Sequence, residues 1–322
     1  MSTSATPLRW GVLGAARIAE RALIPAIRAA GGQIVAVGCR DAARGRAYAD
    51  RLGIPEVTDY EGLMRHEGID AIYIALHNGA HLPWTLEAAA QGKHVLCEKP
   101  IGLTVHEVEQ MIAAQWVHKR VIMEAFMYRF HPQITRAREL IRGGALGELR
   151  LMRGAFSFML DDPHDVRWDA RFGGGAMYDV GCYPLNLMRY VTSSEPQIAA
   201  ASAEYSESGV DHALAAQLRF GHVRGQLDCA FSLPFQQYFE AIGTEGRLFL
   251  DQPFLSFKGE TRIQLGDSEE RIPGCDPYEI MVEHFHKVVA GEEALLYSLE
   301  GSLGQARAID AILATAKREH LS

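Results

Sequence analysis

Cysteine is scarce in this chain, and its few cysteines are widely scattered. Their number is odd, no Cys-x-x-Cys pair occurs, and they stand at Cys39, Cys97, Cys182, Cys229 and Cys275. This pattern disfavours a disulfide framework or a structural zinc site and is typical of reduced thiols. Two histidine arrangements suggest a metal, but neither has a carboxylate at metal-ligand spacing: His77 with His81, and His284 with His286. We predict no metal site.

Long apolar runs and blocks of positive charge are also missing. No stretch is long enough to cross a bilayer, and residues 1–9 lack the apolar segment of a secretory signal. The formal net charge is -8, with no run of Lys or Arg, so nucleic acid and acidic membranes are disfavoured as partners. We expect a cytoplasmic protein. The length of 322 residues, with 48% hydrophobic and 22% charged residues, suits two folded domains.

The N-terminal half contains short apolar runs that alternate with helical patterns. The runs are residues 8–13, 33–38, 70–75 and 94–97, and the helical patterns are residues 42–52, 61–66 and 82–90. This alternation predicts βαβ units and a parallel sheet. A further helix is predicted after Thr104, which opens a capping box with Glu107 and precedes an apolar face at helical spacing.

The turn after the first run resembles a phosphate-binding loop in degenerate form. It reads Gly14, Ala15, Ala16, Arg17, Ile18 and Ala19. It fits Gly-x-Gly-x-x-Gly/Ala only with Ala16 in the second glycine position, where a methyl group stands at the expected approach to a pyrophosphate. A plain strand-to-helix turn is the alternative interpretation. Pro25 is expected to kink or interrupt the following helix.

The second run ends in Arg40 and Asp41, which bear on the choice of cofactor. An arginine at this place accepts the 2′-phosphate of NADP, whereas an acidic residue binds the ribose hydroxyls of NAD. Because Arg40 comes first, the sequence favours NADP(H) and leaves NAD(H) open. An exposed ion pair between Arg40 and Asp41 is the structural alternative.

Glu98, Lys99 and Pro100 follow the run at residues 94–97. A lysine at the carboxyl end of a buried parallel strand lies where open α/β sheets bind their ligands. Desolvation shifts the pKa of lysine readily, so Lys99 is a candidate proton carrier or hydrogen-bond donor. A strand-end lysine that points into water is the alternative.

The C-terminal half shows strict alternation of apolar and polar residues. Residues 223–232 and, one strand earlier, residues 214–220 follow this period of two. Such strands have one packed face and one face open to water or to a partner.

With these residues assembled, the chain resembles the glucose-fructose oxidoreductase / inositol dehydrogenase / rhizopine-catabolism (Gfo/Idh/MocA) family. Three segments carry the resemblance: residues 94–100, 123–132 and 173–186. It looks most like the dihydrodiol dehydrogenase and xylose dehydrogenase branch, because Tyr183 stands four residues after Asp179 where inositol dehydrogenases carry histidine. The resemblance implies an α/β protein with an N-terminal Rossmann domain, residues 1–126. It also implies a C-terminal α+β domain, residues 127–322, built on a large, open, mostly antiparallel sheet that often forms a dimer interface, so we expect a homo-oligomer.

The resemblance also implies roles for individual residues. Lys99 matches the family's catalytic lysine, Tyr183 its proton donor and acceptor, and Asp179 the aspartate before it. A spacing of four on a helix places Asp179 and Tyr183 on one face, and a nearby ammonium lowers the pKa of a phenol toward use as a base. The family also suggests a cis bond before Pro100.

Cofactor and substrate contacts complete the implied site. The expected cofactor contacts are Gly14, Ala15, Ala16, Arg17, Ile18, Arg40, Asn78, His81, Glu98 and Lys99. The expected substrate contacts are Lys99, Arg129, His131, Arg167, Asp179 and Tyr183. His77 replaces the proline usual before Asn78, which leaves the path of that loop open, and Asn78 and His81 also suit loop and helix-cap positions.

These residues predict an NADP(H)-dependent oxidoreductase. It would transfer a hydride between nicotinamide and a carbinol or carbonyl of an unphosphorylated sugar or a trans-dihydrodiol. The alternatives are a ketoreductase of a nucleotide-linked keto sugar, a cofactor-retaining glycosidase and, from another class, a nucleotide-sensing binding protein. A sensor has no use for a proton relay of lysine and tyrosine, which argues against the last.

Overall fold

The computed structural model describes residues 7–256 and 258–318, and the chain divides into two compact units. The first unit comprises residues 1–102, 106–127 and 278–302, and the second comprises residues 103–105, 128–277 and 303–322. The first unit therefore includes residues 278–302, which the expected boundary after residue 126 assigns to the second domain. Among the described residues, no helix is both long and apolar enough to span a bilayer.

The first unit is built on a parallel sheet, of which six strands are described, in the order β3-β2-β1-β4-β5-β6. These strands are β1 (Arg9–Leu13), β2 (Gln33–Gly38), β3 (Glu56–Thr58), β4 (Ala71–Ile74), β5 (His94–Cys97) and β6 (Ile122–Glu124). All of the described neighbours pair in parallel. The four predicted strands are confirmed. The strand order reverses direction between β1 and β4, where a doubly wound sheet binds its ligand.

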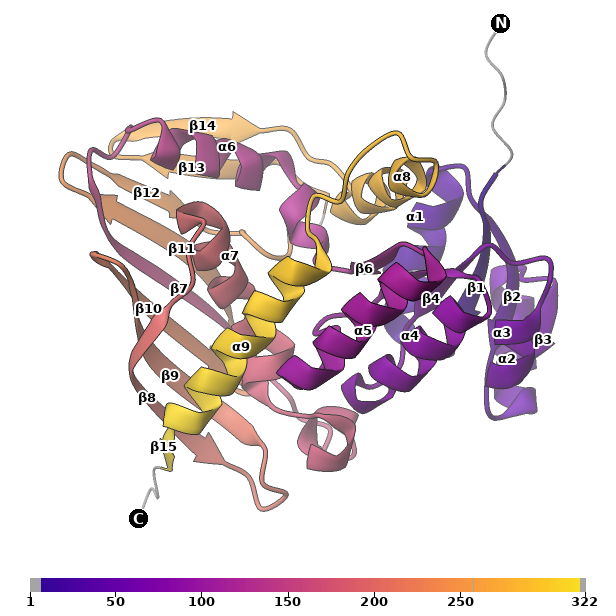
Figure 1. Ribbon diagram of the computed structural model, residues 1–322. Helices are drawn as coiled ribbons and strands as arrows, with labels where there is room; N and C mark the ends of the chain where they lie inside the picture. The colour runs from indigo at the N-terminus through magenta and orange to yellow at the C-terminus, as the bar shows by residue number, and fades with distance from the viewer. Residues whose placement is uncertain (1–6, 257, 319–322) are drawn as a thin grey trace, which may run out of the picture. The chain divides into compact units, whose positions relative to one another are not determined.

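Helices connect these strands (Figure 1). The connecting helices are α1 (Ile24–Ala29), α2 (Ala42–Leu52), α3 (Tyr60–Arg65), α4 (His81–Ala90) and α5 (Val105–His118), and a later helix, α8 (Pro277–Val289), lies almost entirely in this unit. Local signals set the ends of α2. The Asp41 carboxylate accepts a hydrogen bond from the Arg44 amide at its start, and Gly53 adopts a left-handed conformation at its end. The predicted α5 begins directly after Thr104, with Val108 and Met111 buried.

Pro25 has the predicted effect on the first helix. A π-helical turn, η1 (Ala19–Leu23), changes to α-helix at Ile24, and Pro25 lies in the first turn of α1. Proline is tolerated there because the amide of that position needs no intrahelical partner.

Helix α8 returns to the first unit from far along the chain. The indole of Trp10 on β1 donates a hydrogen bond of 3.1 Å to Nε2 of His286, and the Trp10 ring lies 5.0 Å from that of Phe285. Trp10 and Phe285 are both fully buried. Residues from the two ends of the sequence therefore share the core of this unit.

The second unit contains a large sheet, of which nine strands are described, in the order β14-β13-β12-β11-β7-β10-β9-β8-β15. Its strands are β7 (Leu149–Met159), β8 (Gln197–Tyr205), β9 (Asp211–Phe220), β10 (Val223–Ala230), β11 (Ser232–Gly243), β12 (Arg247–Leu250), β13 (Thr261–Leu265), β14 (Ser268–Ile272) and β15 (Lys317–Arg318). The pairs β7–β10 and β8–β15 are parallel and the others antiparallel. The predicted fold class is confirmed.

Helices cover one face of this sheet. They are α6 (Pro132–Arg142), α7 (Cys182–Thr192) and α9 (Leu299–Thr315), the last of which begins in the first unit, with a π-helical turn, η6 (Met177–Gly181), leading directly into α7. The predicted alternation is confirmed, since Val223, Leu227 and Cys229 are buried while Arg224 and Asp228 are exposed. The opposite face of the sheet is therefore open.

Candidate active site

In the first unit, the predicted cofactor residues gather at the carboxyl ends of neighbouring strands. Gly14 follows β1 with a φ of +104°, and a Cβ placed on it would lie 2.9 Å from the carbonyl oxygen of Ala75. The position therefore requires glycine. Ala15 and Ala16 are half-buried, whereas Arg17 and Ile18 are exposed. This backbone can be approached by a ligand, so the turn fits a dinucleotide despite the alanine in its second glycine position.

Two side chains of α2 hold this turn, and sequence reasoning missed both. Arg44 Nη2 donates to the Ala15 carbonyl at 3.0 Å, and the Tyr48 hydroxyl donates to the Ala16 carbonyl at 3.1 Å. Burial raises the pKa of Tyr48, which keeps the phenol protonated and donating. The available signal was their spacing of four on the helix after β2, which places both on one face.

Arg40 lies just beyond β2 and is exposed. Its guanidinium is close enough to Tyr60 to act on the pKa of that phenol, which burial raises and the nearby positive charge lowers in part. Asp41 does not pair with Arg40 among the described contacts; its carboxylate caps α2 instead. Arg40 is therefore exposed and hydrogen-bonded to the Tyr60 phenol, whereas Asp41 has a structural task as the cap of α2.

The loop after β4 contains Asn78 and His81. His77 has φ -68° and ψ 154°, values that a proline also adopts, so replacing the expected proline leaves the loop on a path compatible with proline. Asn78 is half-buried in a short 3-10 turn, η2 (Asn78–Ala80).

His81 is fully buried at the start of α4. Its Nδ1 lies 2.8 Å from the Pro100 carbonyl and its Nε2 3.1 Å from the Leu76 carbonyl. Burial lowers the pKa of His81 to about 4, although the two carbonyls oppose that shift. At neutral pH the ring is thus neutral, and it can donate a hydrogen bond to only one of these two carbonyls. It still lies between the loops after β4 and β5, where it can orient them.

The loop that bears Lys99 is held from several sides. The Tyr73 hydroxyl donates to Glu98 Oε1 at 2.6 Å, and the Lys99–Pro100 peptide bond is cis, as predicted. The Ile101 amide donates to Oε1 of the buried Glu124 at 3.0 Å, and the Ser302 hydroxyl donates to Oε2 of the same carboxylate at 2.6 Å. Lys99 itself is half-buried. The residues around it therefore fix the backbone at the end of β5.

In the second unit, Asp179 and Tyr183 occupy one continuous helical stretch. Asp179 lies in the π-helical turn η6, where its Oδ2 accepts a hydrogen bond of 2.7 Å from Nε of Arg167. Asp179 raises the pKa of Arg167, since its negative charge stabilises the guanidinium. Arg167 also pairs with Asp165 at 3.1 Å. The predicted substrate residues Arg167 and Asp179 are thus neighbours.

Tyr183 is set in an aromatic cluster. Its ring is 5% exposed and lies 5.4 Å from that of Phe156, 5.5 Å from Phe254 and 5.7 Å from Tyr128, measured between ring centroids. These contacts fix the orientation of the phenol, which is what a positioned acid-base group requires.

Arg129 and His131 have structural contacts in the second unit. Arg129 is 5% exposed, its guanidinium lies 4.0 Å above the ring of Tyr190, and its Nη1 donates to Asn186. His131 is 1% exposed and caps α6 by accepting from the Gln133 amide. Both side chains thus contribute to packing in the second unit, and their contact with a substrate stays a prediction.

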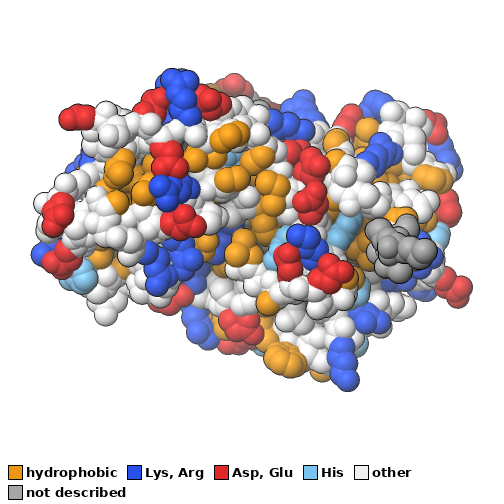
Figure 2. Space-filling view, turned by 90° about the horizontal axis from the view of Figure 1, so that it is seen from above, with side chains coloured by type: hydrophobic (Ala, Val, Ile, Leu, Met, Phe, Trp, Pro, Cys, Tyr) orange, Lys and Arg blue, Asp and Glu red, His pale blue; other side chains and the backbone are white. Residues whose placement is uncertain are grey.

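The described residues contain no cluster of potential metal ligands, and one face of the molecule carries mixed charges (Figure 2). Within residues 7–256 and 258–318, no three His, Cys, Asp or Glu side chains gather as a metal site. On the face shown in Figure 2, the described Lys and Arg side chains are interspersed with Asp and Glu.

Comparison with known proteins places these residues in context. A family model described as "Oxidoreductase family, NAD-binding Rossmann fold" matches residues 8–126, and one described as "GFO/IDH/MocA C-terminal domain" matches residues 134–249. A D-xylose 1-dehydrogenase (NADP(+)) of Haloferax volcanii is 34% identical over 96% of this chain and 98% of its own. The trans-1,2-dihydrobenzene-1,2-diol dehydrogenase of Mus musculus is 32% identical over 74% of this chain and 73% of its own.

Solved structures show the same architecture. A 3-ketoreductase from Actinomadura kijaniata in complex with NADP and TDP-benzene superposes with a TM-score of 0.93, at 27% identity over 98% of this chain and 100% of that chain. An aldose-aldose oxidoreductase from Caulobacter crescentus gives a TM-score of 0.87, at 27% identity over 97% and 98% of the two chains.

Proposed function

This chain belongs to the Gfo/Idh/MocA family of oxidoreductases, and we propose that it transfers a hydride between NADP(H) and a carbinol or carbonyl of an unphosphorylated sugar or a dihydrodiol. As a member, it is an oxidoreductase that acts on hydroxyl or keto groups of sugar-like molecules. The finer proposal concerns the cofactor and the residues that move the proton. Arg40 supports the choice of cofactor, and the fixed backbone at the end of β5 supports the proposed role of Lys99 in proton transfer.

NADP(H) is proposed because of how Arg40, Asp41 and Arg44 are used. Asp41 is engaged as the cap of α2, while Arg40 is exposed at the end of β2. A guanidinium binds a phosphate with charge-assisted hydrogen bonds, and a capping carboxylate is poorly placed to serve a ribose as well. Arg44 supports the backbone of the first turn through Ala15. The bound nicotinamide nucleotide supplies or accepts the hydride.

Lys99 and Tyr183 are proposed to handle the proton on the substrate oxygen. Lys99 lies in the loop after β5, which is held by Glu98, Glu124 and His81, so its side chain extends from a fixed backbone. The ring of Tyr183 is held by three aromatic neighbours, and its hydroxyl is the group proposed to exchange the proton. Asp179, paired with Arg167, is proposed to bind a substrate hydroxyl. Structures of the related ketoreductase include variants with a lysine or a tyrosine replaced.

A substrate panel tests this proposal. Aldoses, trans-dihydrodiols and a dTDP-linked keto sugar are offered with NADP(H) and then NAD(H), and turnover is followed at the nicotinamide absorbance. We expect turnover of a free sugar or diol with NADP(H), and collapse of turnover in Lys99→Met without a matching fall in melting temperature. Turnover confined to the dTDP-linked sugar favours the ketoreductase alternative. Tight NADP binding with no turnover of any substrate would sink the enzyme proposal in favour of a sensor.

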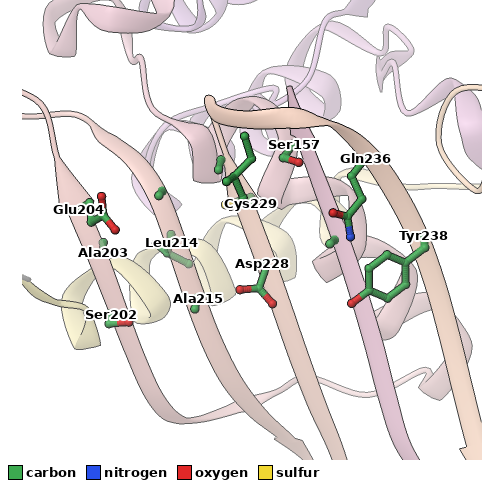
Figure 3. Close-up of a pocket in the computed structure, with 14 residues that line it drawn as sticks. Ser157, Ser202, Ala203, Glu204, Leu214, Ala215, Asp228, Cys229, Gln236 and Tyr238 are labelled. Carbon is green, nitrogen blue, oxygen red and sulfur yellow. The ribbon is translucent and has the colours of Figure 1, made fainter. Parts of the chain in front are cut away.

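We also propose that the open face of the large sheet binds a second copy of this chain. Residues on adjacent strands, among them Ala215, Asp228 and Tyr238, line a hollow of about 310 Å³ there (Figure 3). Ala155 on β7 pairs with Asp228 on one side and with Tyr238 on the other. Leu233, which lines this hollow and is 50% exposed, provides an apolar side chain on the same face. A face with both a hollow and an exposed apolar side chain suits an isologous, two-fold interface.

The charges on this face are complementary in the same sense. The anionic side chains Glu204 and Asp228 lie at the hollow. The cationic residues Arg219 on β9 and Arg224 on β10 stand opposite each other in the register of these two strands, toward their other ends. A two-fold axis between these groups brings unlike charges together. Ala215→Arg fills the hollow with a charge and should shift the protein toward monomer in sedimentation equilibrium; an unchanged mass would refute this interface. Exposed Ala199 on β8 gives a control variant, Ala199→Arg.

A further inference from the structure

The helical stretch with Asp179 and Tyr183 begins without a capping side chain of its own. Three glycines precede it, and Gly173 and Gly175 have φ values of +72° and +123°. The π-helical turn η6 that follows has no side-chain cap from its own N-terminal residue, Ala176. The first amides of a helix need partners from elsewhere when the local sequence supplies none.

Asp211, 34 residues farther along the chain, supplies that partner. It is the first residue of β9 and is 4% exposed. Its Oδ2 accepts a hydrogen bond of 2.7 Å from the Met177 amide, and the amides of Ala176 and of Asp211 itself also donate to the carboxylate. Asp211 therefore does for this helix what an N-cap side chain does in others.

The chain around Asp211 is shaped to accommodate its carboxylate. A Cβ on Gly175 would overlap Oδ1 of Asp211, so the glycine is required by space as well as by its φ. The Gly175 amide donates to the Arg167 carbonyl at 3.0 Å, while the guanidinium of Arg167 binds Asp179. The carboxylate, the last glycine and Arg167 thus fix the same few residues.

The far end of the π-helical turn is fixed by β10. A Cβ on Gly181 would lie 2.7 Å from Sγ of Cys229. Cys229 is 2% exposed, and burial raises the pKa of its thiol, so it contacts the turn as a neutral group. With Asp211 at one end and Cys229 at the other, the turn has little freedom to rotate or slide. The direction of the Asp179 and Tyr183 side chains follows from this placement.

We propose that Asp211 is a positioning residue, whose buried carboxylate sets the start of the helical stretch from Ala176 and thereby orients Asp179 and Tyr183 for the reaction. This inference rests on the proposed function for its catalytic consequence only. Asp211 contacts backbone amides and is not itself assigned to substrate. A displacement of reacting groups by about 1 Å costs on the order of 100-fold in rate, so the loss of this anchor should be visible in turnover.

Three variants test the proposal in the full chain. Asp211→Ala removes the acceptor, and Asp211→Asn keeps an amide oxygen that can receive the Met177 amide. Leu248→Ala, at a fully buried position on β12 of the same unit, is the control for general loss of stability. Turnover, KM, the dissociation constant for NADP and peptide-resolved hydrogen exchange are measured well below each melting temperature.

We expect Asp211→Ala to lower kcat by about 10- to 100-fold while NADP affinity, a property of the first unit, stays within twofold. Hydrogen exchange of residues 177–183 should accelerate at least tenfold in this variant and return near the parental rate in Asp211→Asn. Leu248→Ala should retain kcat. Parental kcat in Asp211→Ala, unchanged exchange in this stretch, or an equal kcat loss in Leu248→Ala would each overturn the proposal. If the parent turns over no substrate, the proposed function has failed and the exchange rates alone decide the role of Asp211.

Discussion

The carboxyl group of Asp211 should give the second unit an unusual dependence of stability on pH. Burial raises the pKa of this group from 3.8 to about 6, against the effect of the backbone amides that donate to it. A carboxyl with a higher pKa in the folded state binds its proton more tightly there than in the unfolded chain. Its contribution to stability is therefore greatest near pH 4, falls as the pH rises through 6, and is constant above that.

The size of this effect follows from the shift. About two pKa units at 1.36 kcal/mol each correspond to about 3 kcal/mol in all, of which about 2 kcal/mol falls between pH 4.5 and pH 7.5. Asp211→Asn cannot titrate, so it lacks this loss. Relative to the parent, the asparagine variant should gain about 2 kcal/mol in unfolding free energy over that pH range. This comparison cancels the titration of other groups, including His81 and His94, which act in the opposite direction.

Hydrogen exchange in β9 and β10 measures the opening of the second unit by itself. Parent and variant are compared between pH 4.5 and 7.5 at increasing urea, with rates corrected for the intrinsic effect of pH. Glu207→Gln, at an exposed turn position between β8 and β9, provides a matched loss of one carboxylate. A difference between Asp211→Asn and the parent that changes by less than 1 kcal/mol across this range would refute the reasoning.

Other predictions concern the proposed cofactor and proton groups. Arg40→Ala should weaken NADP(H) binding by about 10- to 100-fold and leave NAD(H) binding nearly unchanged. Arg44→Ala, which removes the hydrogen bond to the Ala15 carbonyl, should weaken the binding of both cofactors. Fluorescence titration measures the affinities, and equal losses of NADP(H) and NAD(H) affinity in Arg40→Ala would contradict the role of Arg40 in cofactor choice. Tyr183→Phe should lower turnover by about 10²–10⁴-fold with a parental melting temperature and remove one ionisation from the pH-rate profile; parental turnover would leave Tyr183 a packing residue. Because burial lowers the pKa of His81 to about 4, its ring should show no protonation above pH 5 in an NMR titration, and its contribution to stability should be lost as the pH falls from 6.5 through 4.

Sequence patterns predicted those features that depend on neighbouring residues. The apolar runs at residues 33–38 and 94–97 coincide with β2 and β5, because a parallel strand buried on both faces leaves a continuous apolar signature. The helical pattern at residues 42–52 coincides with α2 for a similar reason, with Asp41 and Gly53 marking its ends. The alternation in β9 and β10 likewise predicted which side chains are buried.

Features that depend on distant residues could not be predicted in this way. Asp211 resembles any polar residue at a strand start, and nothing local relates it to a helix 34 residues earlier. Arg44 and Tyr48 bind carbonyls of a turn about 30 residues away. The π-helical turn around Asp179 leaves no periodic signal, since five residues are too few to distinguish it from an α-helix. The sequence thus predicts the reacting groups of the candidate site, whereas the residues that hold them in place are seen only in the folded structure.

The return of residues 278–302 to the first unit has a consequence for biosynthesis. Trp10 emerges early from the ribosome, but its hydrogen-bond partner His286 follows only after the whole segment 128–277 has been made. Glu124 likewise precedes its partner Ser302 by the whole of segment 128–277. The first unit therefore begins first but is completed only after most of the second unit has been made. A fragment cut after residue 126 leaves a buried tryptophan without its cover, whereas excising the inserted segment and joining residue 127 to residue 278 keeps all of these partners together. An isolated cofactor-binding protein should be engineered by the second route.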